Sequence, residues 1–183
     1  IEYEWVKINP FDQDKVIRAL ASADAGIIDV EPYDREIFSR INGRNRLLIR
    51  YGVGYDAVNL EDARACNIHI ARTQGANANA VAEMALTMIL ALKRKLLQSA
   101  LDGKNAWAPL IGAELAGSTV GILGFGAVGK TLARRLQGFD CKLLAYDTYH
   151  DTQAAAALGV EFADLNTVLS QSDAVSVHLA LTE

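Results

Sequence analysis

Residues Thr119–Leu136 read TVGILGFGAVGKTLARRL, a pattern of an apolar strand, a glycine-rich turn and a helix. Gly124, Gly126 and Gly129 have G-x-G-x-x-G spacing in that turn. The first glycine permits the tight turn, the second lets a pyrophosphate approach the backbone, and the third lets the helix pack close to the sheet. Unpaired amides at the positive end of the helix dipole would hold the phosphates. The stretch therefore predicts a dinucleotide-binding unit.

The next apolar strand, Lys142–Tyr146, leads into Asp147, 18 residues after Gly129. A carboxylate at this position could accept hydrogen bonds from the adenosine ribose hydroxyls and would repel a 2′-phosphate. We therefore predict NAD, and not NADP, as the cofactor. A glycine turn can also be a tight loop without a ligand, but the strand, the helix and the acidic residue in register favour the NAD site.

Short apolar runs alternate with segments of helical spacing along the rest of the chain. Most runs are continuously apolar, which is typical of parallel strands covered on both faces. We predict strands at Trp5–Ile8, Gly26–Val30, Leu47–Tyr51, Ile68–Ala71, Val120–Leu123, Leu143–Tyr146 and Ala174–Leu179. We predict helices at Asp14–Ala23, Asp34–Ile41, Leu60–Ala65, Ala80–Leu96, Val128–Leu136, Thr152–Leu158 and Leu165–Leu169. This alternation predicts an α/β fold with parallel sheets.

The segment Asp102–Gly117 is rich in glycine and has little periodicity, so we interpret it as a connection between two α/β units. We expect the boundary near Leu97, which divides the chain into residues 1–97 and 98–183.

Composition narrows the class of partner. The chain has 183 residues, of which 51% are hydrophobic and 22% charged, and this balance is typical of a soluble globular protein. The net charge of −4 argues against nucleic acid and anionic membranes, so a small molecule is the expected partner. The longest apolar run, Met84–Leu92, is far shorter than the roughly 20 residues of a membrane span. Two distant cysteines, Cys66 and Cys141, predict neither disulfides nor a metal site and fit the cytoplasm.

A second glycine turn, Arg50–Asp56, reads RYGVGYD and follows a predicted strand. Its glycines would expose the amides of Val53 and Gly54 as a small anion site at the carboxyl end of that strand. The alternative is a plain turn with Arg50 in solvent, which is locally the commoner outcome.

Several segments together resemble the D-isomer-specific 2-hydroxyacid dehydrogenase family. They occur in one order: Arg50–Asn59, Thr73–Glu83, Gly112–Gly117, the glycine turn and Val177–Thr182. The resemblance begins near Ala25 and implies a flavodoxin-like substrate domain at 1–97 and a Rossmann NAD-binding domain at 98–183, both incomplete. It implies an oxidoreductase that transfers a hydride between NAD(H) and a small 2-hydroxy or 2-oxo acid.

The resemblance also implies the site residues. The amides of Val53 and Gly54 would hold the substrate carboxylate, with Arg50 near the other end of the substrate. The residues implied to line the cofactor are Thr73, Gly124, Gly126, Ala127, Val128, Gly129, Asp147, His178 and Leu179. Two positions depart from the family pattern, because Gln74 and Ala180 stand where proline is usual.

No catalytic residue is expected in this chain. In the family, an arginine polarises the substrate carbonyl, a histidine donates the proton and a glutamate tunes that histidine. The resemblance places all three after the last motif of this sequence and implies truncation at both ends. His178 would lie on the cofactor side, and His69, between two isoleucines, is interpreted as structural.

The helix over residues 79–96 is rich in alanine and methionine around much of its circumference, and the resemblance implies that part of this surface is a homodimer interface. Other functions remain open. The chain could be an NAD(H)-sensing regulator, similar to transcriptional corepressors of the same fold. It could also come from an NAD enzyme of different chemistry, such as a formate or phosphonate dehydrogenase.

Overall fold

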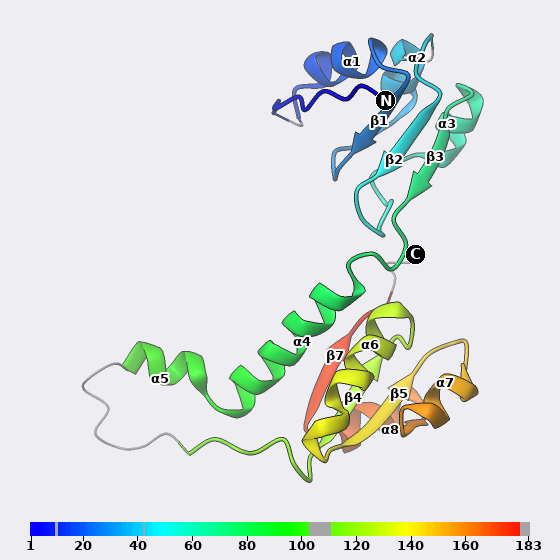
Figure 1. Cartoon of the computed structure of the whole chain (residues 1–183). Helices are drawn as coiled ribbons and strands as arrows, with labels where there is room; N and C mark the ends of the chain where they lie inside the picture. Colours follow the sequence, from blue (N-terminus) through cyan, green and yellow to red (C-terminus); the bar gives the residue numbers. More distant parts are fainter. Residues whose placement is uncertain (10, 42, 103–110, 180–183) are drawn as a thin grey trace. The chain divides into compact units, whose positions relative to one another are not determined.

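A computed structural model describes residues 1–9, 11–41, 43–102 and 111–179 (Figure 1). The chain forms two compact units, Ile1–Ala76 and Asn77–Glu183. Each unit has its own sheet, and every strand pairing in both sheets is parallel. The predicted α/β fold is therefore confirmed.

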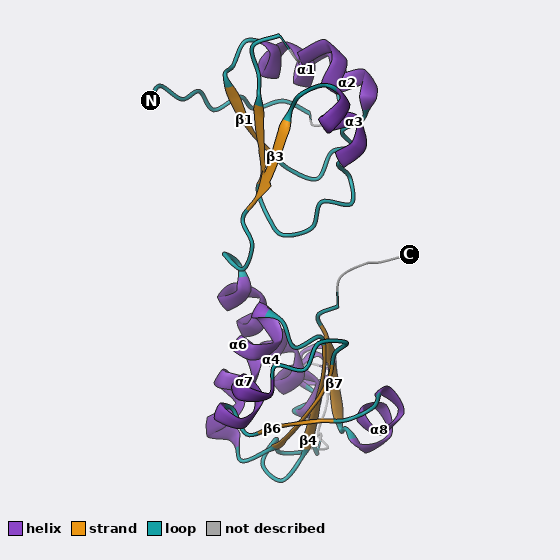
Figure 2. Cartoon of the chain, turned by 90° about the vertical axis from the view of Figure 1, so that its right-hand side faces the viewer, coloured by secondary structure: helices purple, strands orange, loops and turns teal. Residues whose placement is uncertain are grey.

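The first unit has a three-stranded sheet in the order β1-β2-β3. Its elements are α1 (Gln13–Ala21), β1 (Ala25–Ile28), α2 (Arg35–Ile41), β2 (Leu47–Arg50), α3 (Leu60–Ala65) and β3 (His69–Arg72). Figure 2 shows the three helices on one side of this sheet. Ile28 and Leu48 are buried on that side, whereas Ile27 on the other face is 74% exposed. The unit thus has one core, between the sheet and its helices.

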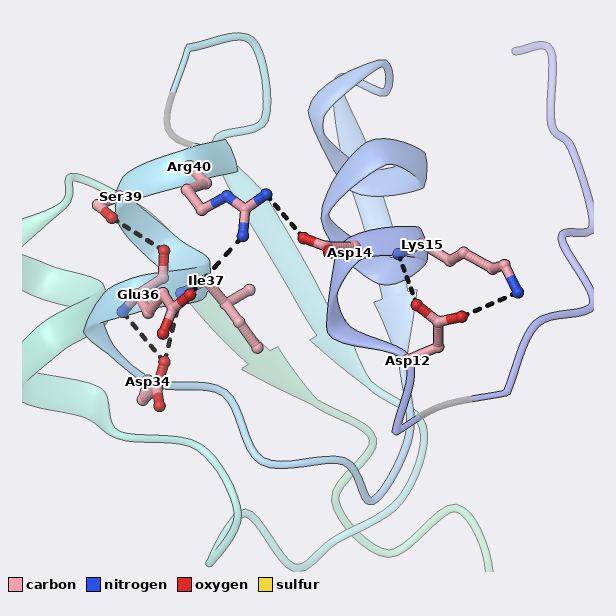
Figure 3. Close-up of polar contacts among 8 residues, drawn as sticks. All are labelled: Asp12, Asp14, Lys15, Asp34, Glu36, Ile37, Ser39 and Arg40. Atoms are coloured by element: carbon pink, nitrogen blue, oxygen red, sulfur yellow. Dashed lines mark hydrogen bonds and ion pairs between the residues drawn. The ribbon is translucent and has the colours of Figure 1, made fainter.

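Acidic side chains fix the helices of the first unit (Figure 3). Asp12 caps α1 by accepting a hydrogen bond from the Lys15 amide at 3.2 Å. Asp34 accepts hydrogen bonds from two amides at the start of α2. A guanidinium nitrogen of Arg40 on α2 lies 2.9 Å from Asp14 on α1. The carboxylates of Asp12 and Asp34 thus accept hydrogen bonds from helix amides that have no acceptor within the helix. The ion pair of Arg40 and Asp14 joins α2 to α1 at the surface.

The second unit has a four-stranded sheet in the order β6-β5-β4-β7. Its strands are β4 (Thr119–Leu123), β5 (Lys142–Tyr146), β6 (Val160–Phe162) and β7 (Ala174–Val177). Its helices are α4 (Ala78–Lys93), α5 (Leu96–Asp102), α6 (Ala127–Leu136), the 3₁₀ turn η2 (Gln137–Phe139), α7 (Thr152–Ala157) and α8 (Leu165–Gln171). Helices cover both faces of this sheet, with α8 on the side opposite α4, α6 and α7 (Figure 2).

The strand order of the second unit reverses at β4. After β4 the chain builds β5 and β6 outward on one side and then places β7 on the other side. Parallel sheets bind ligands outside the carboxyl ends of the strands at such a switch point. The topology therefore predicts a ligand site at the carboxyl ends of β4 and β7.

The predicted strand at Trp5–Ile8 is wrong. Residues 1–9 have neither helix nor strand, and Trp5 is 89% exposed. A strand needs a neighbour that satisfies its backbone groups, and within the described residues β1 pairs only with β2. The apolar pattern of this segment was therefore not sufficient for a strand.

Three further differences concern the second unit. The sequence did not predict β6. The helix expected at residues 80–96 is α4, which ends at Lys93, and α5 is a separate helix after it, because Lys95 has a left-handed φ of 53° between the two. The units divide after Ala76 and not near residue 97, because α4 packs on α6 and buries Ala82 and Ile89 in the second core.

Of the predicted connection at Asp102–Gly117, residues 103–110 lie outside the described residues, and 111–117 contain neither helix nor strand. In the described chain, no helix combines the length and the apolar character that crossing a membrane requires.

Candidate functional site

Gly124 joins the ends of β4 and β7. Its φ of +98° favours glycine, and a Cβ there would lie 2.7 Å from the carbonyl carbon and oxygen of His178. The His178 amide donates a hydrogen bond to the Leu123 carbonyl at 2.6 Å. The structure therefore brings Gly124 together with His178 and Leu179, as the switch point requires.

Gly126 and Gly129 differ in what surrounds them. Gly126 is the N-cap of α6, and its own position supplies no side-chain hydrogen bond to the first amides of the helix. A Cβ added to Gly126 would meet no atom within 4 Å. A Cβ on Gly129 would instead collide with the Gly124 carbonyl oxygen. Ala127 and Val128 begin α6, so their amides have no acceptor within the helix. The turn thus offers open space beside free amides, which is a cradle that fits a pyrophosphate.

Asp147, directly after β5, faces the glycine turn. Its Oδ2 accepts a hydrogen bond from the Phe125 amide at 2.6 Å, and its Oδ1 accepts one from the Tyr149 amide at 3.1 Å. Burial alone would raise the pKa of Asp147, but the backbone hydrogen bonds outweigh it and leave the pKa below its ordinary value. The group is an anion at neutral pH, with lone pairs left for further donors.

An ion pair that the sequence analysis missed supports the same turn. Lys130 Nζ lies 2.5 Å from Asp151 Oδ2 and 5.9 Å from the centre of the Phe125 ring. Asp151 is also the N-cap of α7. The pair therefore ties α6, which carries the cradle, to α7. A lysine directly after the third glycine was the only signal for it in the sequence.

In the first unit, the loop Arg50–Gly54 is held by its carbonyl groups. Arg50 donates to the Tyr51 carbonyl and pairs with Asp29 at 3.0 Å. The Thr73 amide and hydroxyl both donate to the Gly52 carbonyl, at 3.2 Å each. A guanidinium nitrogen of Arg72 donates to the Val53 carbonyl at 3.3 Å.

The amides of Val53 and Gly54, in contrast, donate no hydrogen bond to any described residue. These two amides, beside carbonyl groups that already have donors, are suited to bind an anion. Arg50 is only 12% exposed and is engaged by Asp29, so its contact with the far end of a substrate remains a prediction. The Thr73 hydroxyl is engaged by Gly52, and its contact with the cofactor also remains a prediction.

His178 has a structural partner. One ring nitrogen, Nε2, lies 2.9 Å from Ser176 Oγ, and burial lowers the pKa of the ring, which keeps it neutral at pH 7. Of the two positions that depart from the family pattern, Ala180 lies outside the described residues. Within the described ranges, no three His, Cys, Asp or Glu side chains gather as metal ligands would.

Comparison with known proteins gives one consistent result. Residues 86–183 match the family model described as "D-isomer specific 2-hydroxyacid dehydrogenase, NAD binding domain". The chain is 33% identical over 184 residues to hydroxypyruvate reductase of Thermotoga maritima, covering 98% of this chain and 55% of the relative. It is 32% identical over 148 residues to glyoxylate reductase of Thermococcus litoralis, covering 75% and 45%.

A solved structure agrees with these relatives. The apo-structure of D-lactate dehydrogenase from Escherichia coli matches with a TM-score of 0.79 at 30% identity, covering 92% of this chain and 55% of that chain. The chain thus spans about half the length of the proteins it matches.

Proposed function

Because the chain belongs to the D-isomer-specific 2-hydroxyacid dehydrogenase family, we propose that it carries the NAD site and the substrate-carboxylate site of an oxidoreductase. The reaction transfers a hydride between NAD(H) and a small 2-hydroxy or 2-oxo acid. The cradle at Gly126 beside the Asp147 carboxylate is the observation that carries this proposal.

Each part of the cradle has a role toward NAD, which supplies or accepts the hydride when bound. The amides of Ala127 and Val128 bind the pyrophosphate, and Gly126 leaves room for it. Asp147 accepts hydrogen bonds from the adenosine ribose and repels a 2′-phosphate. The strand end at His178 and Leu179 lines the cofactor beside Gly124.

The substrate binds through its carboxylate to the free amides of Val53 and Gly54. The names of the relatives favour two-carbon and three-carbon acids, glyoxylate and hydroxypyruvate. In terms of the two units, Ile1–Ala76 holds substrate and Asn77–Glu183 holds NAD. None of the residues given these roles transfers a proton, and His178 is unsuited to do so because its ring is paired with Ser176 and its pKa is lowered.

We also propose a homodimer in the cytoplasm. One face of α4 leaves large apolar side chains exposed at intervals of four residues: Met84, Met88 and Leu92. Exposed apolar stripes of this kind mark protein interfaces, and a second copy would cover this one.

Titration of the 183-residue chain with NADH and with NADPH, followed by nucleotide fluorescence, tests the cofactor assignment. We expect tighter binding of NADH. Asp147→Asn should reduce the preference about tenfold, because a charged hydrogen-bond acceptor contributes roughly 1.5–3 kcal/mol. Glu161→Gln, which changes an exposed carboxylate on β6, is the matched control and should leave the preference unchanged.

The affinity for NADH, which lacks the titrating 2′-phosphate of NADPH, should stay constant from pH 8 to pH 5. A lowered pKa keeps Asp147 ionised throughout this range, and the affinity should fall only when the pH drops through that lowered pKa. Equal affinity of the unaltered chain for both cofactors would contradict the proposal.

A further inference from the structure

Arg72 is the last residue of β3. In the parallel register of β2 and β3 it lies beside Arg50. Its guanidinium reaches the loop Arg50–Gly54, where it donates to the Val53 carbonyl at 3.3 Å. The guanidinium carbon also lies 5.0 Å from the centre of the Tyr55 ring, which is a cation–π distance. Two contacts therefore hold this side chain against the loop.

The Val53 carbonyl and the Gly54 amide belong to the same peptide group. Because that group is planar and trans, its C=O and N–H bonds point in opposite directions. A donor fixed on the carbonyl therefore fixes the direction of the Gly54 N–H. The same donor polarises the peptide and makes its N–H a stronger donor.

Arg72 and Arg50 differ in their ionic partners. Arg50 forms an ion pair with Asp29 at 3.0 Å. For Arg72, no carboxylate lies within ion-pair distance among the residues that the structure describes. Its charge thus acts on the Val53–Gly54 peptide without a neutralising partner.

We propose that Arg72 is a positioning residue, which orients and polarises the Val53–Gly54 peptide so that the Gly54 amide binds the substrate carboxylate. Arg72 acts through the peptide and does not itself contact the carboxylate. Thr73 assists by holding the preceding Gly52 peptide in place. This proposal rests on the proposed function, because it needs the carboxylate to bind at Val53 and Gly54.

Amide NMR of the full 183-residue chain tests the proposal, with glycolate as the probe. In Arg72→Met without glycolate, the Gly54 amide proton should move upfield, because its peptide loses a charged donor. The affinity of the Arg72→Met variant for glycolate should fall about fivefold, which is the loss expected for one hydrogen bond. Arg72→Lys keeps a charged donor and should recover part of both effects. Arg64→Met removes the same charge from an exposed position of α3 and should change neither the Gly54 shift nor the affinity.

The outcomes separate this proposal from the function beneath it. If glycolate does not shift the amide resonances of Val53 and Gly54 in the unaltered chain, the proposed carboxylate site and the proposed role of Arg72 are both wrong. If glycolate shifts them but Arg72→Met binds it equally well, only the role of Arg72 fails.

The Leu48 amide, in the core of the same unit, reports whether each variant is folded. Should Arg72→Met prove unfolded, Tyr55→Leu provides a second route, because it removes the stack that holds the guanidinium. We expect this variant to weaken glycolate binding, and unchanged binding would overturn the proposal.

Discussion

At the scale of single residues, Gly126 and Gly129 belong to one motif but serve different purposes. A Cβ added to Gly126 would meet no atom within 4 Å apart from its chain neighbours, so alanine there would meet only a ligand. Gly129 faces the Gly124 carbonyl oxygen and lies 3.1 Å, measured from an added Cβ, from an Ile122 methyl group. Packing therefore requires glycine at position 129, whereas at position 126 only the proposed pyrophosphate would require it.

Alanine at each position should separate these two requirements. Gly126→Ala should leave the free energy of unfolding within about 0.5 kcal/mol of the original and weaken NADH binding about tenfold or more, through loss of a phosphate contact. Gly129→Ala should lower the free energy of unfolding by about 1–3 kcal/mol, because the helix must move away from the strand. Urea unfolding and NADH titration measure both quantities, and an unstable Gly126→Ala protein would refute the distinction.

The sequence was sufficient for this turn, but in the loop Arg50–Gly54 it did not reveal the contact that Arg72 makes. Glycine spacing and Asp147 lie within one strand–turn–helix–strand segment, so local pattern determined their placement. The contact of Arg72 with Val53 joins residues 19 apart and depends on the register of β2 and β3. No local periodicity carries that information, and Arg72 was accordingly not predicted.

At the scale of elements, the packing of α4, and not its distance from the weakly periodic segment, decides to which unit it belongs. Its apolar residues surround the helix, so periodicity alone did not reveal which sheet it covers. In the structure Ala82 and Ile89 are buried against the second unit, and Arg135 on α6 donates to Glu83 at 2.9 Å. For this reason the unit boundary lies before α4, whereas the weakly periodic segment after it had suggested residue 97.

The opposite face of α4 gives a prediction about assembly. If Met84 and Met88 meet a second copy, the double variant Met84→Glu and Met88→Glu would place four carboxylates in one symmetric interface. We expect the unaltered chain to sediment as a dimer and this variant as a monomer. Leu60→Glu, on α3, alters another half-exposed apolar residue and should leave the dimer intact. A monomeric unaltered chain at micromolar concentration would contradict the prediction.

At the scale of the whole molecule, each unit has a core of its own. The first core is built on Phe38 and Leu48, and the second on Ile122 and Leu132. All four side chains are fully buried, and no residue belongs to both cores. The proposed ligands divide in the same way, with the carboxylate on the first unit and NAD on the second.

Two cores predict two unfolding transitions, of which NADH should raise only one. A ligand at 100 times its dissociation constant stabilises the fold that binds it by about 2.7 kcal/mol, so calorimetry of the full chain should show one transition moving upward with NADH. Phe38→Ala should lower the other transition, since such truncations cost about 3–5 kcal/mol, and should preserve the NADH response. Leu132→Ala should lower the NADH-responsive transition by a similar mechanism. A single transition that NADH and both substitutions shift alike would instead mean that the two cores unfold as one cooperative unit.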